Sequence, residues 1–138
     1  MVQGAFLADA ATMGLHWIYK QEEIAAKIEE GGGDKSGIFF EPPSCPFYTA
    51  EAGKLSPWGE EMLPILTALA NSETYSNQEI ATACADHFKV YEGYKNGVVK
   101  KFMTAWEEGK AFDACAVDDS QARGIIKTPL LVARFVGK

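Results

Sequence analysis

The sequence predicts an all-α protein. Apolar residues recur every three or four positions in several segments, residues that start and end helices bound those segments, and none alternates apolar with polar residues as a half-buried strand would. At 138 residues, of which 47% are hydrophobic and 23% are charged, the chain is long enough for one domain with a hydrophobic core and too short to expect two. We therefore expect a single helical domain.

Two helices are expected before a long loop. Residues 2–18 carry small and apolar residues at helical spacing, and residues 21–30 form a more exposed helix that a triple glycine ends. The loop over residues 31–55 is rich in glycine and proline and contains an aromatic cluster. Its length is unusual for a connection in a compact domain, which favours a packed, functional loop.

A third helix is expected over residues 56–70. Ser56 is a suitable N-cap, Pro57 suits the first helical position, and Glu60 and Glu61 complement the positive end of the helix dipole. Pro64 lies in the interior of this helix and is expected to kink it, because it removes a backbone donor.

Three further helices follow. A capping box from Ser76 to Glu79 opens a helix that runs to about Tyr91. Asn96 starts the next, which Gly109 ends, and a last helix is expected from Asp118 or Asp119 through residue 135.

Charge and cysteine content narrow the classes of function. The net charge of −6, without a basic patch, argues against a nucleic-acid or anionic-membrane partner. Cys45, Cys84 and Cys115 form no CxxC pair and no metal-ligand pattern with the two histidines, so reduced thiols in the cytoplasm are expected. The apolar N-terminal segment is interrupted by Asp9 and follows no basic segment, which disfavours a signal peptide or membrane span.

Three polar residues share one face of the first helix. Asp9, Thr12 and His16 are spaced i, i+3 and i+7, and the other faces are almost wholly apolar. Polar groups inside a hydrophobic helix need partners. Either they contact the aromatic loop or a neighbouring helix, or they form a stripe that faces a ligand.

A second polar cluster is Asp118, Asp119, Ser120 and Gln121. One interpretation is a loop that holds the phosphates or ribose hydroxyls of a ligand, with the acids as metal ligands. The other is an aspartate cap and a second acid that complements the helix dipole.

Other candidate residues are weaker. Adjacent acids such as Glu60 and Glu61 point about 100° apart on a helix, so both rarely reach one ion. His87 lies on an apolar stripe typical of a core histidine, and Cys45 has no base near it in sequence.

Three segments together resemble the ADP-ribosylglycohydrolase superfamily, especially its branch related to J-type lens crystallins. They are GAFLADAATMGLHWIY, FYTAEAGKLSPWGEEMLPILTALA and VDDSQARGIIKTPLLVARFVG, and GYKNGVVKKFMTAWEEG between them is similar to the same branch. The resemblance implies an all-α orthogonal helical bundle. Because family chains are about twice as long, it also implies that residues 1–138 are the N-terminal part of one such domain, incomplete at its C-terminus, with exposed apolar surface that favours self-association.

The resemblance also implies a site that binds Mg²⁺ and ADP-ribose. The first-helix signature keeps its acid at Asp9, a further acidic position falls on His16, and these two would be the catalytic residues. The first metal motif falls on Ser56, Pro57 and Trp58, where both metal carboxylates are lost, which leaves Glu60 as the nearest acid.

The segment that binds substrate in the family falls on Asp118, Asp119, Ser120, Gln121 and Ala122, and the second metal motif is absent. Two functions follow from the resemblance. The chain is a hydrolase that cleaves an ADP-ribosyl glycosidic bond, or it is an inactive relative, either a crystallin-like structural protein or an ADP-ribose binder.

Overall fold

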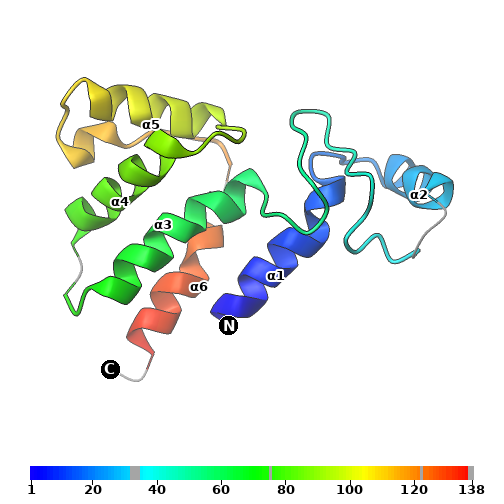
Figure 1. Cartoon of the computed structure of the whole chain (residues 1–138), viewed down its shortest axis with the longest axis horizontal. Helices are drawn as coiled ribbons and strands as arrows, with labels where there is room; N and C mark the ends of the chain where they lie inside the picture. The colour runs from blue at the N-terminus through cyan, green and yellow to red at the C-terminus, as the bar shows by residue number, and fades with distance from the viewer. Residues whose placement is uncertain (32–34, 75, 122, 137–138) are drawn as a thin grey trace. The chain divides into compact units, whose positions relative to one another are not determined.

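The computed structural model of the chain describes residues 1–31, 35–74, 76–121 and 123–136. These residues form helices and no strand, which confirms the all-α prediction (Figure 1). The elements are α1 (Val2–Thr12), η1 (Met13–Leu15), α2 (Gln21–Glu30), α3 (Pro57–Asn71), α4 (Asn77–Val90), α5 (Gly97–Glu107), η2 (Phe112–Cys115) and α6 (Arg123–Phe135).

The chain divides into two compact units. Unit 1 is Met1–Gly59 and unit 2 is Glu60–Lys138, so the boundary falls within the first turn of α3. Unit 1 contains α1, η1, α2 and the long loop, whereas unit 2 contains most of α3 and all the later helices.

In unit 1 the first α-helix is shorter than predicted. It ends at Thr12 and continues only as the short helix η1, instead of reaching residue 18. The long loop supplies a hydrogen-bond donor to the backbone at the end of α1, since the N–H of Phe39 donates to the carbonyl of Ala11 at 2.7 Å. A Cβ atom at Gly14 would lie 2.5 Å from the carbonyl oxygen of Phe40, and Trp17 has a φ of 67° that no α-helix accommodates. Close packing of the loop therefore ends the helix early.

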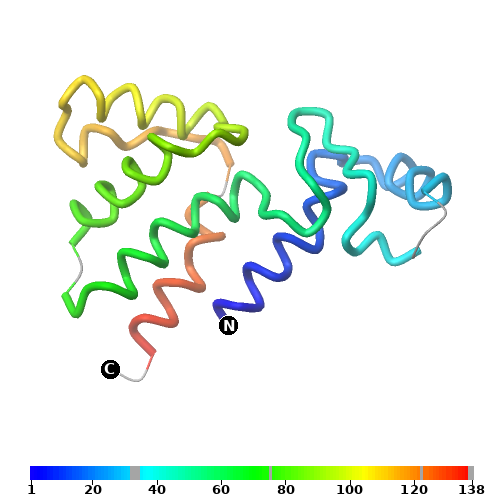
Figure 2. The backbone as a smooth tube through the Cα atoms, viewed as in Figure 1, coloured from blue at the N-terminus to red at the C-terminus, as the bar shows by residue number. Residues whose placement is uncertain are grey.

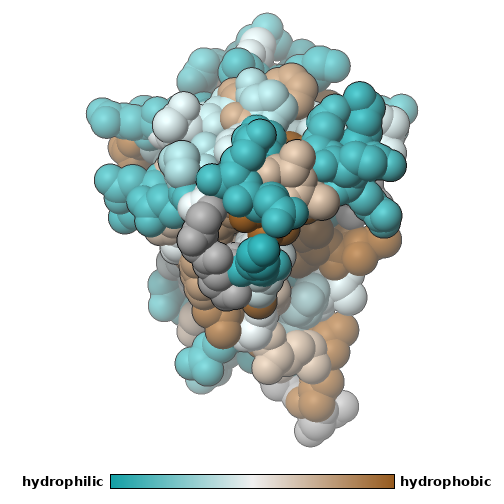
Figure 3. Space-filling model, turned by 90° about the vertical axis from the view of Figure 1, so that its right-hand side faces the viewer, coloured by the Kyte–Doolittle hydropathy of each residue, from teal (hydrophilic) through white to brown (hydrophobic). Residues whose placement is uncertain are grey.

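The long loop of unit 1 passes beside the C-terminal end of α1 (Figure 2), and its side chains are packed, as predicted. Trp17 contacts Phe47 with ring centroids 4.7 Å apart and stacks on Trp58 at 5.3 Å. By contrast, α2 buries no residue, and hydrophilic side chains gather over the upper part of the surface seen in Figure 3. Gly32 and Gly33 of the triple glycine lie outside the described residues.

The predicted helix signals of unit 2 are confirmed. Both hydrogen bonds of the capping box between Ser76 and Glu79 are present at the start of α4. The side chain of Asn96 accepts from two backbone N–H groups at the start of α5, and Gly109 just beyond that helix has a φ of 76°. One cluster of buried apolar residues in the unit lies between α4 and α5 and consists of Ala85, Phe88, Val99 and Met103.

The last helix begins later than predicted. Residues 116–121 are not helical, and α6 starts at Arg123, so the interpretation of Asp118 or Asp119 as its cap is wrong. Asp119 instead accepts a hydrogen bond from the side chain of Arg123. Pro129 lies inside α6 and Pro64 inside α3, and both helices continue through their proline.

Candidate functional site

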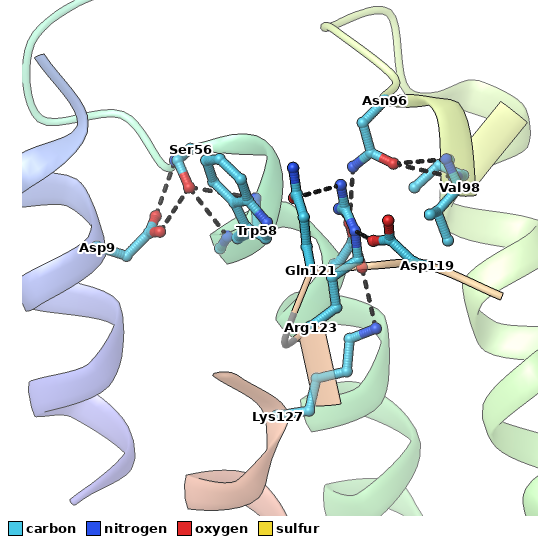
Figure 4. Close-up of polar contacts among 12 residues, drawn as sticks. Asp9, Ser56, Trp58, Asn96, Val98, Asp119, Gln121, Arg123 and Lys127 are labelled. Atoms are coloured by element: carbon cyan, nitrogen blue, oxygen red, sulfur yellow. Dashed lines mark hydrogen bonds and ion pairs between the residues drawn. The ribbon is translucent and has the colours of Figure 1, made fainter. Parts of the chain in front are cut away.

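In unit 1, Asp9 binds the residue that caps α3. Its Oδ2 accepts from the backbone N–H of Ser56 at 2.8 Å, and its Oδ1 accepts from the Ser56 hydroxyl at 2.5 Å (Figure 4). The same hydroxyl oxygen accepts from the N–H groups of Trp58 and Gly59 at 3.2 and 3.4 Å. Ser56 is fully buried. Asp9 thus acts on the start of α3 through Ser56, whereas the hydroxyl of Thr12 in the same stripe donates to the carbonyl of Ala8 within α1.

Gly59 leaves room for this contact. A Cβ atom at Gly59 would lie 2.2 Å from Oδ2 of Asp9 and 3.0 Å from Cβ of Leu55. Because real Cβ atoms do not approach so closely, any larger residue would displace the Asp9 carboxylate. The glycine is the sequence signal for this close approach.

His16 lies in the same neighbourhood of unit 1. Its Nε2 is 3.2 Å from the hydroxyl of Thr12, its Nδ1 is 3.3 Å from the hydroxyl of Tyr48, and its ring meets Trp58 edge-on at 5.4 Å. Burial lowers the pKa of His16 below 6.5, and the charge of Asp9 opposes this shift. The imidazole is therefore mainly neutral at pH 7. The aromatic loop therefore supplies a partner for His16 through Tyr48, which agrees with the alternative that the polar residues of this helix contact the loop.

The residues at the expected metal position do not fit Mg²⁺. Pro57 and Trp58 carry no metal-binding oxygen, and both oxygens of Asp9 already accept hydrogen bonds from Ser56. Magnesium prefers several oxygen ligands in octahedral geometry. Among the described residues, no three His, Cys, Asp or Glu side chains are grouped so that they could hold a metal.

Glu60, the nearest acid to that position, lies in unit 2 against His87. Its Oε2 is 3.3 Å from Nε2 of His87, and both side chains are largely buried. The His87 ring also stacks on Tyr91, with centroids 5.6 Å apart. Glu60 therefore supports the packing between α3 and α4, as well as carrying a negative charge in the first turn of α3.

Glu61 has a role that the sequence analysis missed. It is 3% exposed, and it lies at the centre of a buried polar cluster instead of at the helix dipole. Its Oε1 accepts from Nη1 of Arg123 at 2.8 Å and from Nδ2 of Asn96 at 2.7 Å, and its Oε2 contacts Nζ of Lys127 at 2.9 Å. The cluster therefore ties α3 to α6 and to the start of α5 (Figure 4).

Arg123 connects this cluster to the predicted substrate segment. Its Nε donates to Asp119 and its Nη2 donates to Oε1 of Gln121 at 2.9 Å. The hydrogen bond from Arg123 lowers the pKa of Asp119 below its ordinary value. Sequence reasoning passed over Arg123, although an arginine four residues after an aspartate was an available signal.

A cavity of about 570 Å³ opens beside the cluster, entirely within unit 2. Its lining includes three of the four predicted substrate-binding residues, Asp118, Asp119 and Gln121, but not Ser120. Ala122 lies outside the described residues. The remaining lining residues are Glu61, Ile65, Asn77, Ile80, Ala81, Cys84, Phe88, Val98, Val99, Phe102, Cys115, Ala116, Val117, Arg123, Gly124 and Lys127.

Of the three cysteines, Cys84 has a raised pKa that makes it a poor nucleophile. Cys84 lines the cavity, and burial raises its pKa to about 11, although the charge of Lys127 opposes the shift and that of Glu61 adds to it. The Cys84 thiol therefore stays protonated at neutral pH and is a poor nucleophile. Cys45 and Cys115 are also free thiols. A cytoplasmic location remains a prediction.

Comparison with known proteins identifies no relative of this chain. No protein-family model, no curated protein and no solved structure matches the chain. In the part of the chain that the structure describes, we find no helix of the length and apolarity that crossing a membrane requires.

Proposed function

We propose that this chain is an ADP-ribosylglycohydrolase-like protein without hydrolase activity, related in role to the crystallin-like structural branch. The observation that carries the proposal is the use of both Asp9 carboxylate oxygens by one partner, Ser56. The proposal includes the expectation that residues 1–138 are part of one domain of that type.

The chemistry of the site supports an inactive protein. A catalytic carboxylate must reach a water or the substrate, and a metal-dependent hydrolase must orient that water on its ion. Each Asp9 oxygen already accepts a hydrogen bond from Ser56, and the neighbouring positions hold Pro57 and Trp58. In this proposal Asp9 stabilises the fold and activates no water.

One observation favours the alternative, a working hydrolase. His16 is neutral at pH 7 because burial lowers its pKa, and it lies against Trp58, so it has the protonation state of a general base. In this alternative, His16 accepts the proton of a water and Asp9 lines the ADP-ribose site.

Turnover assays separate the two functions. The purified chain is incubated with ADP-ribosyl-arginine and with ADP-ribosylated protein, with and without Mg²⁺, and release of ADP-ribose is measured. We expect no release above a blank for the wild type. Release that falls in Asp9→Asn and His16→Gln, but not in the exposed matched variant Asp86→Asn, would establish the hydrolase.

Calorimetric titration of ADP-ribose tests the remaining possibility, a binder of ADP-ribose. A structural protein gives no heat of binding with or without Mg²⁺. Binding that is independent of Mg²⁺ would replace the structural proposal with an ADP-ribose binder, and binding that strengthens with Mg²⁺ would revive the hydrolase.

A further inference from the structure

The cavity of unit 2 combines apolar walls with a charged rim. Its walls include Ile65, Ile80, Phe88 and Phe102, and its acidic residues Asp118 and Asp119 come from the segment before α6. At about 570 Å³ the cavity falls within the range of about 300–1,000 Å³ that is typical of small-molecule sites. Such sites are mostly apolar, with a few polar groups that fix the orientation of the ligand.

Some charged side chains of the lining form ion pairs, whereas another does not. Of its two cationic side chains, Arg123 and Lys127 both contact Glu61, and Arg123 also holds Asp119. Asp118, in contrast, is exposed and makes no hydrogen bond or ion pair among the residues that the structure describes. With three carboxylates and two cations, the lining carries a net charge of −1.

We propose that this cavity binds a small organic cation with an aromatic body, whose ring packs among Ile65, Phe88 and Phe102 and whose ammonium group pairs with Asp118. The site is separate from the residues of unit 1, so the inference goes beyond the proposed function and does not depend on it. Phe102 lines the cavity, and an aromatic ring can attract a cation as well as supply apolar surface.

An anionic ligand such as a phosphate or pyrophosphate fits this cavity poorly. Both cations of the lining already contact Glu61, whose side chain is 4% exposed, so an anionic ligand would compete with this carboxylate for them. A buried carboxylate that loses its cation is strongly unfavourable. The cluster therefore sets the sign of charge that the cavity accepts, although it touches the ligand only at its edge.

Two probes with the same ring and opposite charge test the proposal. Tryptamine is a cation and indole-3-acetate is an anion, and each is titrated into the full chain with binding followed by NMR chemical shifts. For ligands of this size we expect a dissociation constant for tryptamine on the order of a millimolar. Because exposed ion pairs contribute modestly, we expect tryptamine to bind about fivefold more tightly than indole-3-acetate.

The variants Asp118→Asn and Asp86→Asn locate the effect. Both replace an exposed aspartate in unit 2 by its amide, but only Asp118 lines the cavity. Asp118→Asn should reduce the preference to within about twofold, whereas Asp86→Asn should preserve it. The tryptamine shifts should centre on the resonances of Ile80 and Phe102.

Three results would overturn the inference. They are no tryptamine binding to the folded wild type, equal binding of the two probes, or the same response of the two variants. None of these results bears on the hydrolase assay, so the two proposals fail separately.

Discussion

Two carboxylates near the start of α3 are held in different ways. Asp9 in unit 1 accepts two hydrogen bonds from Ser56 and forms no ion pair within the part of the chain that the structure describes, whereas Glu61 in unit 2 is buried among Arg123, Lys127 and Asn96. In the first arrangement, an aspartate of α1 accepts hydrogen bonds from the residue that caps α3. The second is a charge-compensated cluster, in which loss of one partner leaves a charge in a poorly solvated place. The difference predicts unequal costs of mutation.

The largest effect is expected when the Glu61 cluster loses its arginine. Arg123→Met leaves Glu61 buried with Lys127 and Asn96 as its remaining partners, and it releases Asp119 and Gln121. Breaking a buried ion pair costs about 3–5 kcal/mol. We expect the unfolding free energy to fall by about 3 kcal/mol, at the lower end of this range, because Lys127 remains. Denaturant unfolding followed by circular dichroism measures the change.

Lys127→Met is the matched control for this cluster. Its side chain is 28% exposed, in comparison with 9% for Arg123, so we expect a loss of at most about 1 kcal/mol. The double variant Glu61→Gln with Arg123→Met should lose less unfolding free energy than the sum of the two single variants. In each single variant one charge of the pair remains without its partner, whereas the double variant removes both charges. Equal costs for Arg123→Met and Lys127→Met would remove the basis of the comparison.

A smaller effect is expected at the Asp9 contact. Gly59→Ala forces the Asp9 carboxylate away from Ser56, and we expect a loss of about 1–2 kcal/mol in unfolding free energy from this overpacking. The control is Gly4→Ala, because a Cβ atom at Gly4 meets nothing within 4 Å. In the first turn of α1 that change should stabilise by up to about 1 kcal/mol. If the two alanine variants had the same stability, the Asp9 contact would contribute nothing.

Local signals in the sequence predicted most of the fold. Ser76, Asn96 and Gly109 act within a few residues of themselves, and each was found where its helix starts or ends. The early end of α1 was not predicted, because it depends on the packing of a loop more than twenty residues away in sequence, at Phe39 and Phe40.

The candidate site was predictable only in part, for the same reason. Asp9 and His16 were found from their spacing on one helix, and Asp118, Asp119 and Gln121 as a polar segment. Glu61 and Arg123 are 62 residues apart in the sequence, so helical periodicity cannot predict that they pair. Glu61 therefore looked like an ordinary acid near a helix start.

The third prediction concerns pH and sharpens the description of unit 1. Burial holds the pKa of His16 below 6.5 in the folded chain. Between pH 6.5 and that lower value the unfolded chain binds more protons, so the free energy of unfolding falls as the pH decreases through this window. In His16→Gln this contribution disappears. Unfolding at roughly pH 7.5 and roughly pH 5.5 measures it.

His87→Gln is the control for the pH prediction, because it removes the other histidine and leaves His16 in place. The contribution of His16 should persist in this variant. A wild type whose stability rises as the pH decreases through the same window would contradict the burial of His16.

The smallest effect is expected at the surface of α6. Ile125 and Val132 of α6, and Val136 just after its end, are 70%, 38% and 68% exposed and are spaced i, i+7 and i+11, so they form one apolar stripe. We expect weak, concentration-dependent self-association through it, measured by analytical ultracentrifugation. Ile125→Lys should weaken association about threefold to tenfold, because burying one isoleucine contributes about 1.5 kcal/mol when complete. Val90→Lys changes an equally exposed residue on α4 and should leave association unchanged. A wild type that stays monomeric at every concentration would show that the stripe, unlike the two carboxylates, needs no partner.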